Sequence, residues 1–167
     1  MDHAEDDGVS ERIEAFLDGR PKARRVRRRH LRPDLARLSQ RPAQLDTRTD
    51  WEAALYHEDA RVARYGRPAS VLVVAIDTDS PQAGERVAPA LGLAIRSAAR
   101  ETDRVARIGP MRFHVLLPET DEAEAAAVAE RIRAACGETP IRLAAASPTR
   151  GQTLIDALAL AVARVDR

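Results

Sequence analysis

The sequence predicts an α/β fold in which helices cover a central sheet. After about residue 46, short apolar runs typical of strands alternate with longer segments of helical period. The predicted order is helix, strand, helix, hairpin, helix, strand, helix, which is the order of a sheet with flanking helices. Hydrophobic residues make up 44% of the 167 residues and charged residues 32%, a composition typical of one globular domain with its own core.

Residues 1–45 are predicted to form a charged N-terminal arm with short helices. Ser10 to Leu17 has the pattern of a short amphipathic helix. Arg20 to Arg32 carries eight Lys and Arg residues and no acid. Such a run is typical of a solvated tail, of an arm that contacts an acidic protein, or of a segment that contacts nucleic-acid phosphates. No aromatic residue interrupts it, which argues against base stacking on a single strand.

The first element of the predicted domain is a helix that follows Asp46 and spans about four turns. Trp51 lies on its apolar side and is expected to anchor the helix by packing. Gly66 and Pro68 end the helix. Ala69 to Ile76 is a β-branched apolar run between turn residues, so it predicts a buried strand.

A second helix is predicted from about Glu85 to Arg100. Arg104 to Ile108 and Arg112 to Leu117 predict two strands, and the intervening Gly109-Pro110-Met111 has the length of a hairpin connection. His114 is expected to point outward from its strand. The apolar face of the second helix is expected to consist of Val87, Leu91, Leu93, Ala94 and Ala98.

Thr120 is expected to cap the third helix, which has an acidic first turn and runs to Gly137. Cys136, near the end of this helix, is expected to be a small buried hydrophobe. Ile141 to Ala146 predicts the fourth strand, and a closing helix is predicted from about Thr153 to Val165.

Charge and cysteine content limit the function classes. The formal net charge of +1 gives no strong field that would concentrate polyanions around the whole protein. A single cysteine, Cys136, excludes an internal disulfide and a thiolate zinc cluster, so we expect a reducing compartment. The N-terminus is acidic where a signal peptide would be basic, and the longest apolar run, Val71 to Ile76, is too short to span a bilayer. We therefore expect a cytoplasmic protein without a membrane span.

The stretch from Asp103 to Thr120 resembles the signature hairpin of diguanylate cyclase (GGDEF) domains, in which Arg-x-Gly-Gly-Asp/Glu-Glu-Phe leads into a strand ending in Leu-Pro-x-Thr. Arg61 to Asp77 is similar to the first helix and strand of that family, and Ala129 to Arg133 to the helix after the hairpin. The resemblance covers about residues 46 to 167. It implies a nucleotidyl-cyclase-like sheet with a ferredoxin-like core, a β-hairpin and flanking helices.

The same resemblance implies a degenerate GGDEF domain over residues 46–167. Met111 and Arg112 stand where the family has the acidic pair that holds a divalent metal, and Ala75 stands at the family's other metal carboxylate. The guanine-recognising loop of the family is missing between Thr78 and Glu85, and the closing helix lacks the family's phosphate-contacting lysine pattern. We therefore expect no catalytic residue, no metal site, no cofactor and no cyclase activity.

Two further acids, Asp77 and Asp79, resemble a metal pair, but acids in a polar loop are usually solvated. We therefore expect no metal there either.

A ligand site of the family is retained in the sequence. Arg100-Glu101-Thr102-Asp103 matches, in residues and in spacing from the hairpin, the Arg-x-x-Asp inhibitory site at which family members bind cyclic di-GMP, and Arg131 falls at the position of that site's third residue. Guanine offers N7 and O6 to an arginine fork and N1–H and N2–H to a carboxylate. The resemblance thus implies a ligand site made of Arg100, Asp103 and Arg131. The alternative is a structural ion pair between Arg100 and Asp103 at a helix end.

Two functions remain open at this point. The first is a non-catalytic cyclic di-GMP receptor or adaptor in bacterial signalling, which changes how the domain meets a protein partner or a second copy of itself. The second is a ligand-free protein–protein interaction module, or a DNA-associated regulatory module, in which the hairpin and sheet form a docking surface and Arg20 to Arg32 contacts an acidic partner or nucleic acid. Residual activity on GTP is disfavoured by the missing metal ligands.

Overall fold

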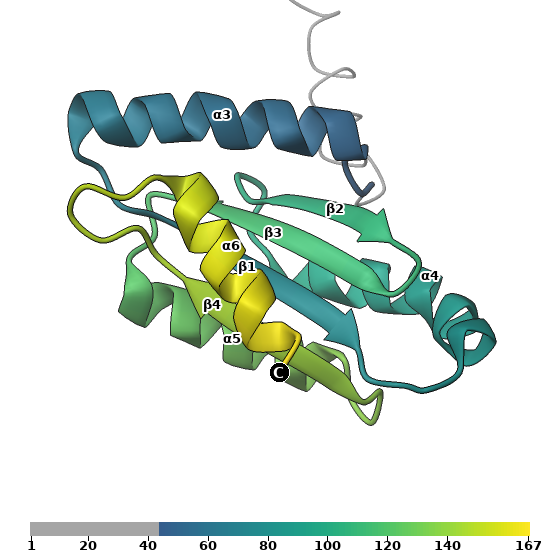
Figure 1. Ribbon diagram of the computed structural model, residues 1–167. Coiled ribbons are helices and arrows are strands. Elements are labelled where there is room, and N and C mark those ends of the chain that lie inside the picture. The colour runs from purple at the N-terminus through teal and green to yellow at the C-terminus, as the bar shows by residue number, and fades with distance from the viewer. Residues whose placement is uncertain (1–43) are drawn as a thin grey trace, which may run out of the picture. The chain divides into compact units, whose positions relative to one another are not determined.

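The computed structural model describes residues 44–167, which form a four-stranded antiparallel sheet flanked by helices (Figure 1). The predicted α/β fold is confirmed. The predicted segments Ser10 to Leu17 and Arg20 to Arg32 lie outside the described residues. In the sheet order β2-β3-β1-β4, the strands are β1 (Ala69–Ile76), β2 (Arg104–Gly109), β3 (Arg112–Pro118) and β4 (Ile141–Ala146). The helices are α3 (Arg48–Tyr65), α4 (Pro81–Ala98), α5 (Glu122–Ala135) and α6 (Leu154–Val165).

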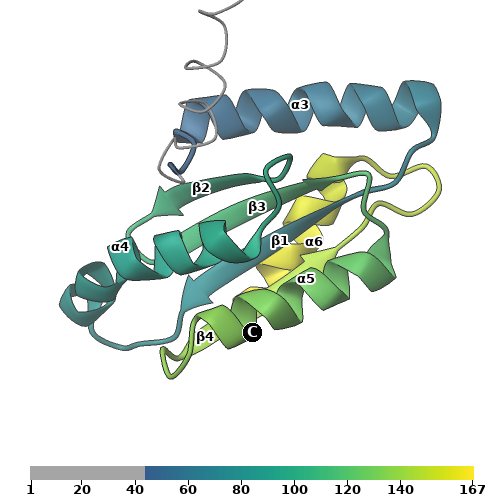
Figure 2. The ribbon, with the colours of Figure 1, turned by 180° about the vertical axis from the view of Figure 1, so that it is seen from behind.

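Helices cover both faces of the sheet, so β1 is buried along its whole length. Figure 2 shows α4 and α5 on one face, while α3 and α6 lie on the other face in Figure 1. Alternate residues of a strand point to opposite faces. One hydrophobic cluster therefore contains Leu72, Val74 and Ile76 with residues of α4 and α5, and the second contains Val71, Val73 and Ala75 with residues of α3 and α6.

Helix α3 is fixed to the sheet by Trp51, which is 1% exposed and confirms the expected packing anchor. Its indole Nε1–H donates to the Arg104 carbonyl oxygen at 3.3 Å, and its ring meets the His114 ring edge-on at 5.2 Å. The prediction that His114 points outward is wrong, because this side chain is 7% exposed. Helix α3 covers the face toward which His114 points, so both faces of β3 are buried.

Helix α4 differs from its prediction in its start and in its buried face. It begins at Pro81 after the N-cap Ser80, four residues before the predicted start at Glu85, and it ends at Ala98. Val87 and Leu93, which were expected to face the core, are 38% and 60% exposed. Glycine and alanine take three of the five buried positions, and a Cβ added at either buried glycine would meet a neighbouring side chain closely. The buried residues of α4 are Gly84, Ala88, Leu91, Gly92 and Ile95.

Helix α5 is capped by Asp121 rather than by the predicted Thr120. Asp121 and Glu124 exchange side-chain-to-backbone hydrogen bonds in a capping box. Thr120 is buried, and its hydroxyl donates to the Pro118 carbonyl oxygen at 2.9 Å. Cys136 at the end of the helix is 7% exposed, which confirms the prediction of a buried thiol.

Helix α6 agrees with its prediction, with Thr153 as N-cap. The α3 residue Asp59 also supports its first turn, because a carboxylate oxygen of Asp59 accepts a hydrogen bond from the Leu154 N–H at 2.7 Å. Within residues 44–167, no helix has both the length and the apolar character that a membrane crossing requires.

Candidate functional site

The turn between α4 and β2 contains two of the three predicted site residues, Arg100 and Asp103. The Asp103 side chain points back at this turn, and its Oδ2 accepts a hydrogen bond from the Arg100 backbone N–H at 2.7 Å. The Asp103 N–H in turn donates to the Arg100 carbonyl oxygen at 3.2 Å. These two hydrogen bonds close the turn, so Asp103 shapes the backbone on which Arg100 stands.

The carboxylate of Asp103 is buried and only half satisfied. Asp103 is 2% exposed, and its Oδ1 has no hydrogen-bond partner among the described residues. Burial raises the pKa of this carboxyl above its ordinary value. The Arg100 backbone hydrogen bond and the positive charges of Arg100, Arg96 and Arg131 act in the opposite direction. A buried acceptor without a donor is costly in a stable fold.

The guanidinium groups around Asp103 hold backbone carbonyls. Arg131 of α5 donates through Nε and Nη2 to the Ala98 carbonyl oxygen at 3.3 and 3.2 Å. Arg96 of α4 donates to the Asp103 carbonyl oxygen at 2.6 Å and also to the Arg100 carbonyl oxygen. The structure thus brings the three predicted residues together at the end of α4 and adds Arg96. Only the position of Arg96, one helical turn before Arg100, could have indicated its role from the sequence.

The side chain of Arg100 makes no hydrogen bond or ion pair with any residue in the described part of the chain. In particular, no ion pair joins it to the Asp103 carboxylate, which is bonded to the Arg100 backbone instead. Its five N–H donors are available to a ligand.

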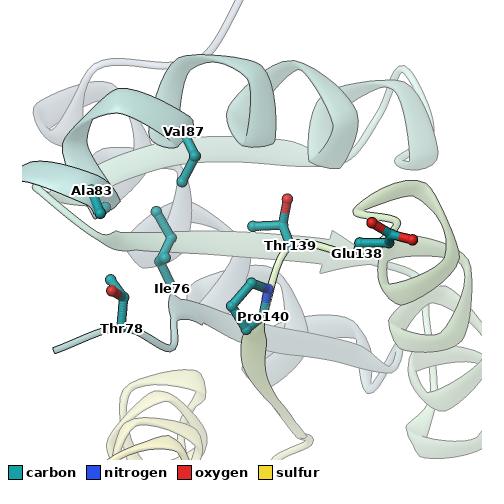
Figure 3. A pocket seen from close by; sticks show the side chains of 8 residues that line it. Ile76, Thr78, Ala83, Val87, Glu138, Thr139 and Pro140 are labelled. Atoms are coloured by element: carbon teal, nitrogen blue, oxygen red, sulfur yellow. The ribbon is translucent and has the colours of Figure 1, made fainter. Parts of the chain in front are cut away.

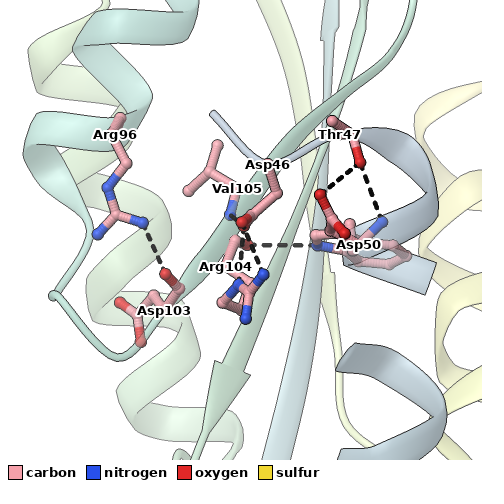
Figure 4. A network of polar contacts seen from close by, with 8 residues as sticks. Asp46, Thr47, Asp50, Arg96, Asp103, Arg104 and Val105 are labelled. Carbon is pink, nitrogen blue, oxygen red and sulfur yellow. Dashed lines mark hydrogen bonds and ion pairs between the residues drawn. The ribbon is translucent and has the colours of Figure 1, made fainter. Parts of the chain in front are cut away.

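A second polar cluster adjoins the turn on the side of helix α3 (Figure 4). Arg104 donates through Nε and Nη2 to the two carboxylate oxygens of Asp46, at 2.9 and 2.7 Å. The Val105 N–H donates to the same carboxylate at 3.2 Å, and the Asp46 N–H donates to the Val105 carbonyl oxygen at 2.7 Å. Two parallel hydrogen bonds make this a bidentate ion pair, which fixes geometry as well as charge. Arg104, the residue after Asp103, is therefore bonded directly to Asp46, two residues before α3.

The tip of the β2–β3 hairpin carries no carboxylate. Ala75 of β1 lies opposite Arg112 of β3 in the strand register, and the Arg112 guanidinium forms an ion pair with Asp166 at the end of α6. Met111 packs over Gly84 of α4, so closely that a side chain at Gly84 would collide with the Met111 sulfur. This end of the sheet is thus lined by a methyl group, a thioether and a cation that is already paired.

No group of three or more His, Cys, Asp or Glu side chains in residues 44–167 is placed to hold a metal ion. Of the two acids that follow β1, Asp77 forms an ion pair with Arg142 of β4 at 3.2 Å.

A surface pocket of about 330 Å³ lies beside the end of β1, between the first turns of α4 and the loop before β4 (Figure 3). Glu138 is the one charged residue among those that line it. No cation lines this pocket to neutralise a phosphate, so it is poorly suited to a nucleoside triphosphate. Its lining residues are Ile76, Thr78, Ala83, Gly84, Val87, Glu138, Thr139 and Pro140.

Comparison with known sequences finds one family and one curated relative. The family model for the diguanylate cyclase GGDEF domain matches residues 42–154. The uncharacterized protein YhcK of Bacillus subtilis is 45% identical over 60 residues, which is 36% of this chain. That match spans 17% of the length of YhcK.

Solved structures share the fold at low sequence identity. A diguanylate cyclase protein from Thermotoga maritima superposes with a TM-score of 0.66 at 18% identity, covering 75% of this chain and 99% of that one. The diguanylate cyclase SiaD of Pseudomonas aeruginosa, solved with its activator SiaC, superposes with a TM-score of 0.63 at 22% identity. This match covers 95% of this chain and 71% of SiaD. The GGDEF domain of DgcB from Caulobacter crescentus, solved with c-di-GMP, superposes with a TM-score of 0.62 at 17% identity. This match covers 73% of this chain and 84% of the DgcB chain.

Proposed function

The chain belongs to the diguanylate cyclase GGDEF domain family, and from this membership we propose that it is a non-catalytic receptor that binds cyclic di-GMP through Arg100, Asp103 and Arg131. The family places the protein in cyclic di-GMP signalling. The ligand binds at the end of α4, away from the hairpin at which the family's cyclases carry out synthesis. As part of the same proposal, the protein acts in the cytoplasm, where an unpaired thiol such as Cys136 stays reduced.

The residues at the hairpin do not fit the divalent metal that cyclase chemistry uses. Hard cations such as Mg²⁺ need oxygen ligands, and carboxylates supply them in phosphoryl transfer. Ala75 and Arg112, at the positions aligned with the family's metal carboxylates, are cross-strand neighbours that offer a methyl group and a positive charge. The Arg112 guanidinium is also paired with the Asp166 carboxylate. These contacts support a role without catalysis.

The observation that carries the receptor proposal is the buried Oδ1 of Asp103, which lies near three arginines and has no hydrogen-bond partner within residues 44–167. Guanine N1–H and N2–H would supply the donors that this carboxylate lacks, while N7 and O6 would accept from an arginine fork. Arg100 follows Ala98 by two residues, and the Ala98 carbonyl oxygen accepts hydrogen bonds from Arg131. Arg131 therefore reaches the same helix end at which Arg100 stands. A dianionic dinucleotide therefore meets a carboxylate for its base and cations for its phosphates.

Calorimetric titration of the purified protein with cyclic di-GMP tests the proposal. Arg100→Ala and Arg131→Ala should each weaken binding by about tenfold or more, since each removes charge-assisted hydrogen bonds. Asp103→Asn keeps an acceptor for the Arg100 N–H but loses the charge that reads guanine, and it should weaken binding similarly. Arg133→Ala is the matched control, because Arg133 lies on α5 two residues from Arg131 and pairs with Glu130 at 3.5 Å.

Binding that each of the three site variants weakens by about tenfold or more, and that the control preserves, would support the receptor. Absence of binding by the unaltered protein would refute it and leave the ligand-free interaction module. Formation of any cyclic dinucleotide from GTP with Mg²⁺ or Mn²⁺ would refute the non-catalytic part of the proposal.

A further inference from the structure

We propose that Asp46 and Arg104 form a latch that holds the candidate cyclic di-GMP site closed, so that ligand binding and release of the start of helix α3 are coupled. The latch rests on the proposed function, because it regulates that same site. Its components are the bidentate ion pair between Asp46 and Arg104 and the two hydrogen bonds between Asp46 and Val105.

The site is closed in the structure. Asp103 is 2% exposed, so a guanine base cannot reach its Oδ1 without movement of the turn. The guanidinium of Arg131 holds the Ala98 carbonyl, and that of Arg96 holds the carbonyls of Arg100 and Asp103. Of the four charged groups at the site, only Arg100 is ready to meet a ligand. Binding therefore requires the turn to move outward and Arg131 to exchange its carbonyl partner for the ligand.

The turn cannot move independently of the latch. Arg104 follows Asp103 directly in the chain, and its guanidinium, its carbonyl and the next backbone N–H are all engaged (Figure 4). The carbonyl of Arg104 accepts from the Trp51 indole, and the other two groups contact Asp46. An outward shift of Asp103 therefore displaces Arg104 and disturbs its contacts to Asp46, two residues before α3, and to Trp51, the first buried residue of that helix.

These contacts fix the sign of the coupling. The latch contacts are complete in the closed form, whereas the ligand contacts form only when the turn has moved. A ligand shifts an equilibrium by the difference in its affinity for the two forms, and the coupling between two sites is reciprocal. Breaking the latch should therefore tighten ligand binding, and ligand binding should loosen the start of α3.

The only tryptophan in the chain lies at the latch and reports its state. Trp51 donates to the Arg104 carbonyl and is 1% exposed, so its emission is sensitive to displacement of Arg104. Addition of cyclic di-GMP should change Trp51 emission in the unaltered full-length protein, and Arg100→Ala should prevent the change.

Titration of full-length variants with cyclic di-GMP tests the direction of the effect. Asp46→Asn and Arg104→Gln should each lower Kd by about fivefold, within the usual range for coupled sites. The double variant should gain no more than either single variant, since both break one latch. Glu52→Gln and Arg48→Gln are matched controls, because they remove the same charges from an exposed ion pair on α3 and should leave Kd unchanged.

The outcomes separate the latch from the receptor. If the Kd of both latch variants equals or exceeds that of the unaltered protein, the latch is overturned while the receptor stands. Tighter binding in the control variants as well would also overturn it, because the effect would then not be specific to the Asp46–Arg104 pair. Absence of binding by the unaltered protein would overturn the receptor and, with it, the latch that rests on the receptor.

Discussion

His114 makes the stability of the domain sensitive to pH at the scale of a single residue. Burial under α3, together with the charges of Arg112 and Arg48, lowers its pKa from the ordinary value of 6.5 to about 4, while Glu52 acts in the opposite direction. Its Nε2 has no hydrogen-bond partner among the described residues. The fold therefore holds a neutral imidazole.

We predict that the free energy of unfolding falls as the pH drops from about 6.5 towards 4. In this window the unfolded chain binds a proton at His114 that the folded chain does not, so acid favours unfolding. The full difference between the two pKa values corresponds to about 3 kcal/mol. Urea unfolding at a series of pH values should show this slope in the unaltered protein and a shallower one in His114→Leu. His57→Leu, at an exposed position of α3, is the control, and a slope equal in all three proteins would contradict the prediction.

Sequence patterns identified residue types and spacings better than the contacts those residues make. The spacing of Arg100, Asp103 and Arg131 predicted a group of residues that the structure brings together, but it gave no sign that Arg131 would hold a carbonyl or that Arg96 would join the group. The outward assignment of His114 failed for a related reason. Alternation along a strand shows which residues share a face, but the helix that covers that face comes from a distant part of the chain.

At the scale of elements, α3 and α6 are joined by a hydrogen bond across 95 positions of sequence. The Asp59 carboxylate accepts from the Leu154 N–H, one of the N–H groups left free at a helix start. Its negative charge also lies at the positive end of the α6 dipole. The bond thus stabilises the first turn of α6 and positions α3 along the sheet.

Asp59→Ala should lower the free energy of unfolding by about 1 kcal/mol, since it removes a capping acceptor together with a favourable charge. Asp59→Asn should cost less, because the amide oxygen still accepts the hydrogen bond. Thermal or urea unfolding measures both. Glu52→Ala, which removes an exposed acid from the same helix, should cost less than about 0.5 kcal/mol. Equal losses in Asp59→Ala and Glu52→Ala would show that the cap contributes nothing.

The elements themselves could be predicted closely because their apolar periods are clear. Strands β1 and β4 match their predicted ranges residue for residue, and Thr153 marks the start of α6. The start of α4 was placed too late although the sequence holds its signal, a serine followed by proline at the first helical position. Its buried face was also predicted wrongly. Apolar periodicity favours Val87 and Leu93 on that face, whereas the structure buries Gly84, Ala88 and Gly92 and leaves Val87 and Leu93 exposed.

At the scale of the whole molecule, residues 42–167 form one compact unit. The few residues before α3 contribute to it directly. Leu45 packs against the cluster that contains Phe113, and Asp46 holds Arg104.

A chain that begins at Thr47 should therefore unfold about 5 °C lower than one that begins at Pro42, since it loses the partly buried Leu45 and the Asp46 ion pair, contacts worth about 1 kcal/mol together. Differential scanning calorimetry of the two truncated chains measures the difference. Equal midpoints of the two truncated chains would contradict the expectation.

The backbone of Asp46 also covers part of one edge of the sheet. Asp46 forms a short parallel bridge with Ala106 on the outer side of β2, the first strand in the sheet order. Exposed edge strands are templates for aggregation, and proteins protect them with short covering segments and charged side chains. Leu45 and Asp46 cover part of this edge, and Arg104 and Arg107 place charges along it. In the described part of the chain β4 has one neighbouring strand, so growth of the sheet by strand addition is directed to the β4 side.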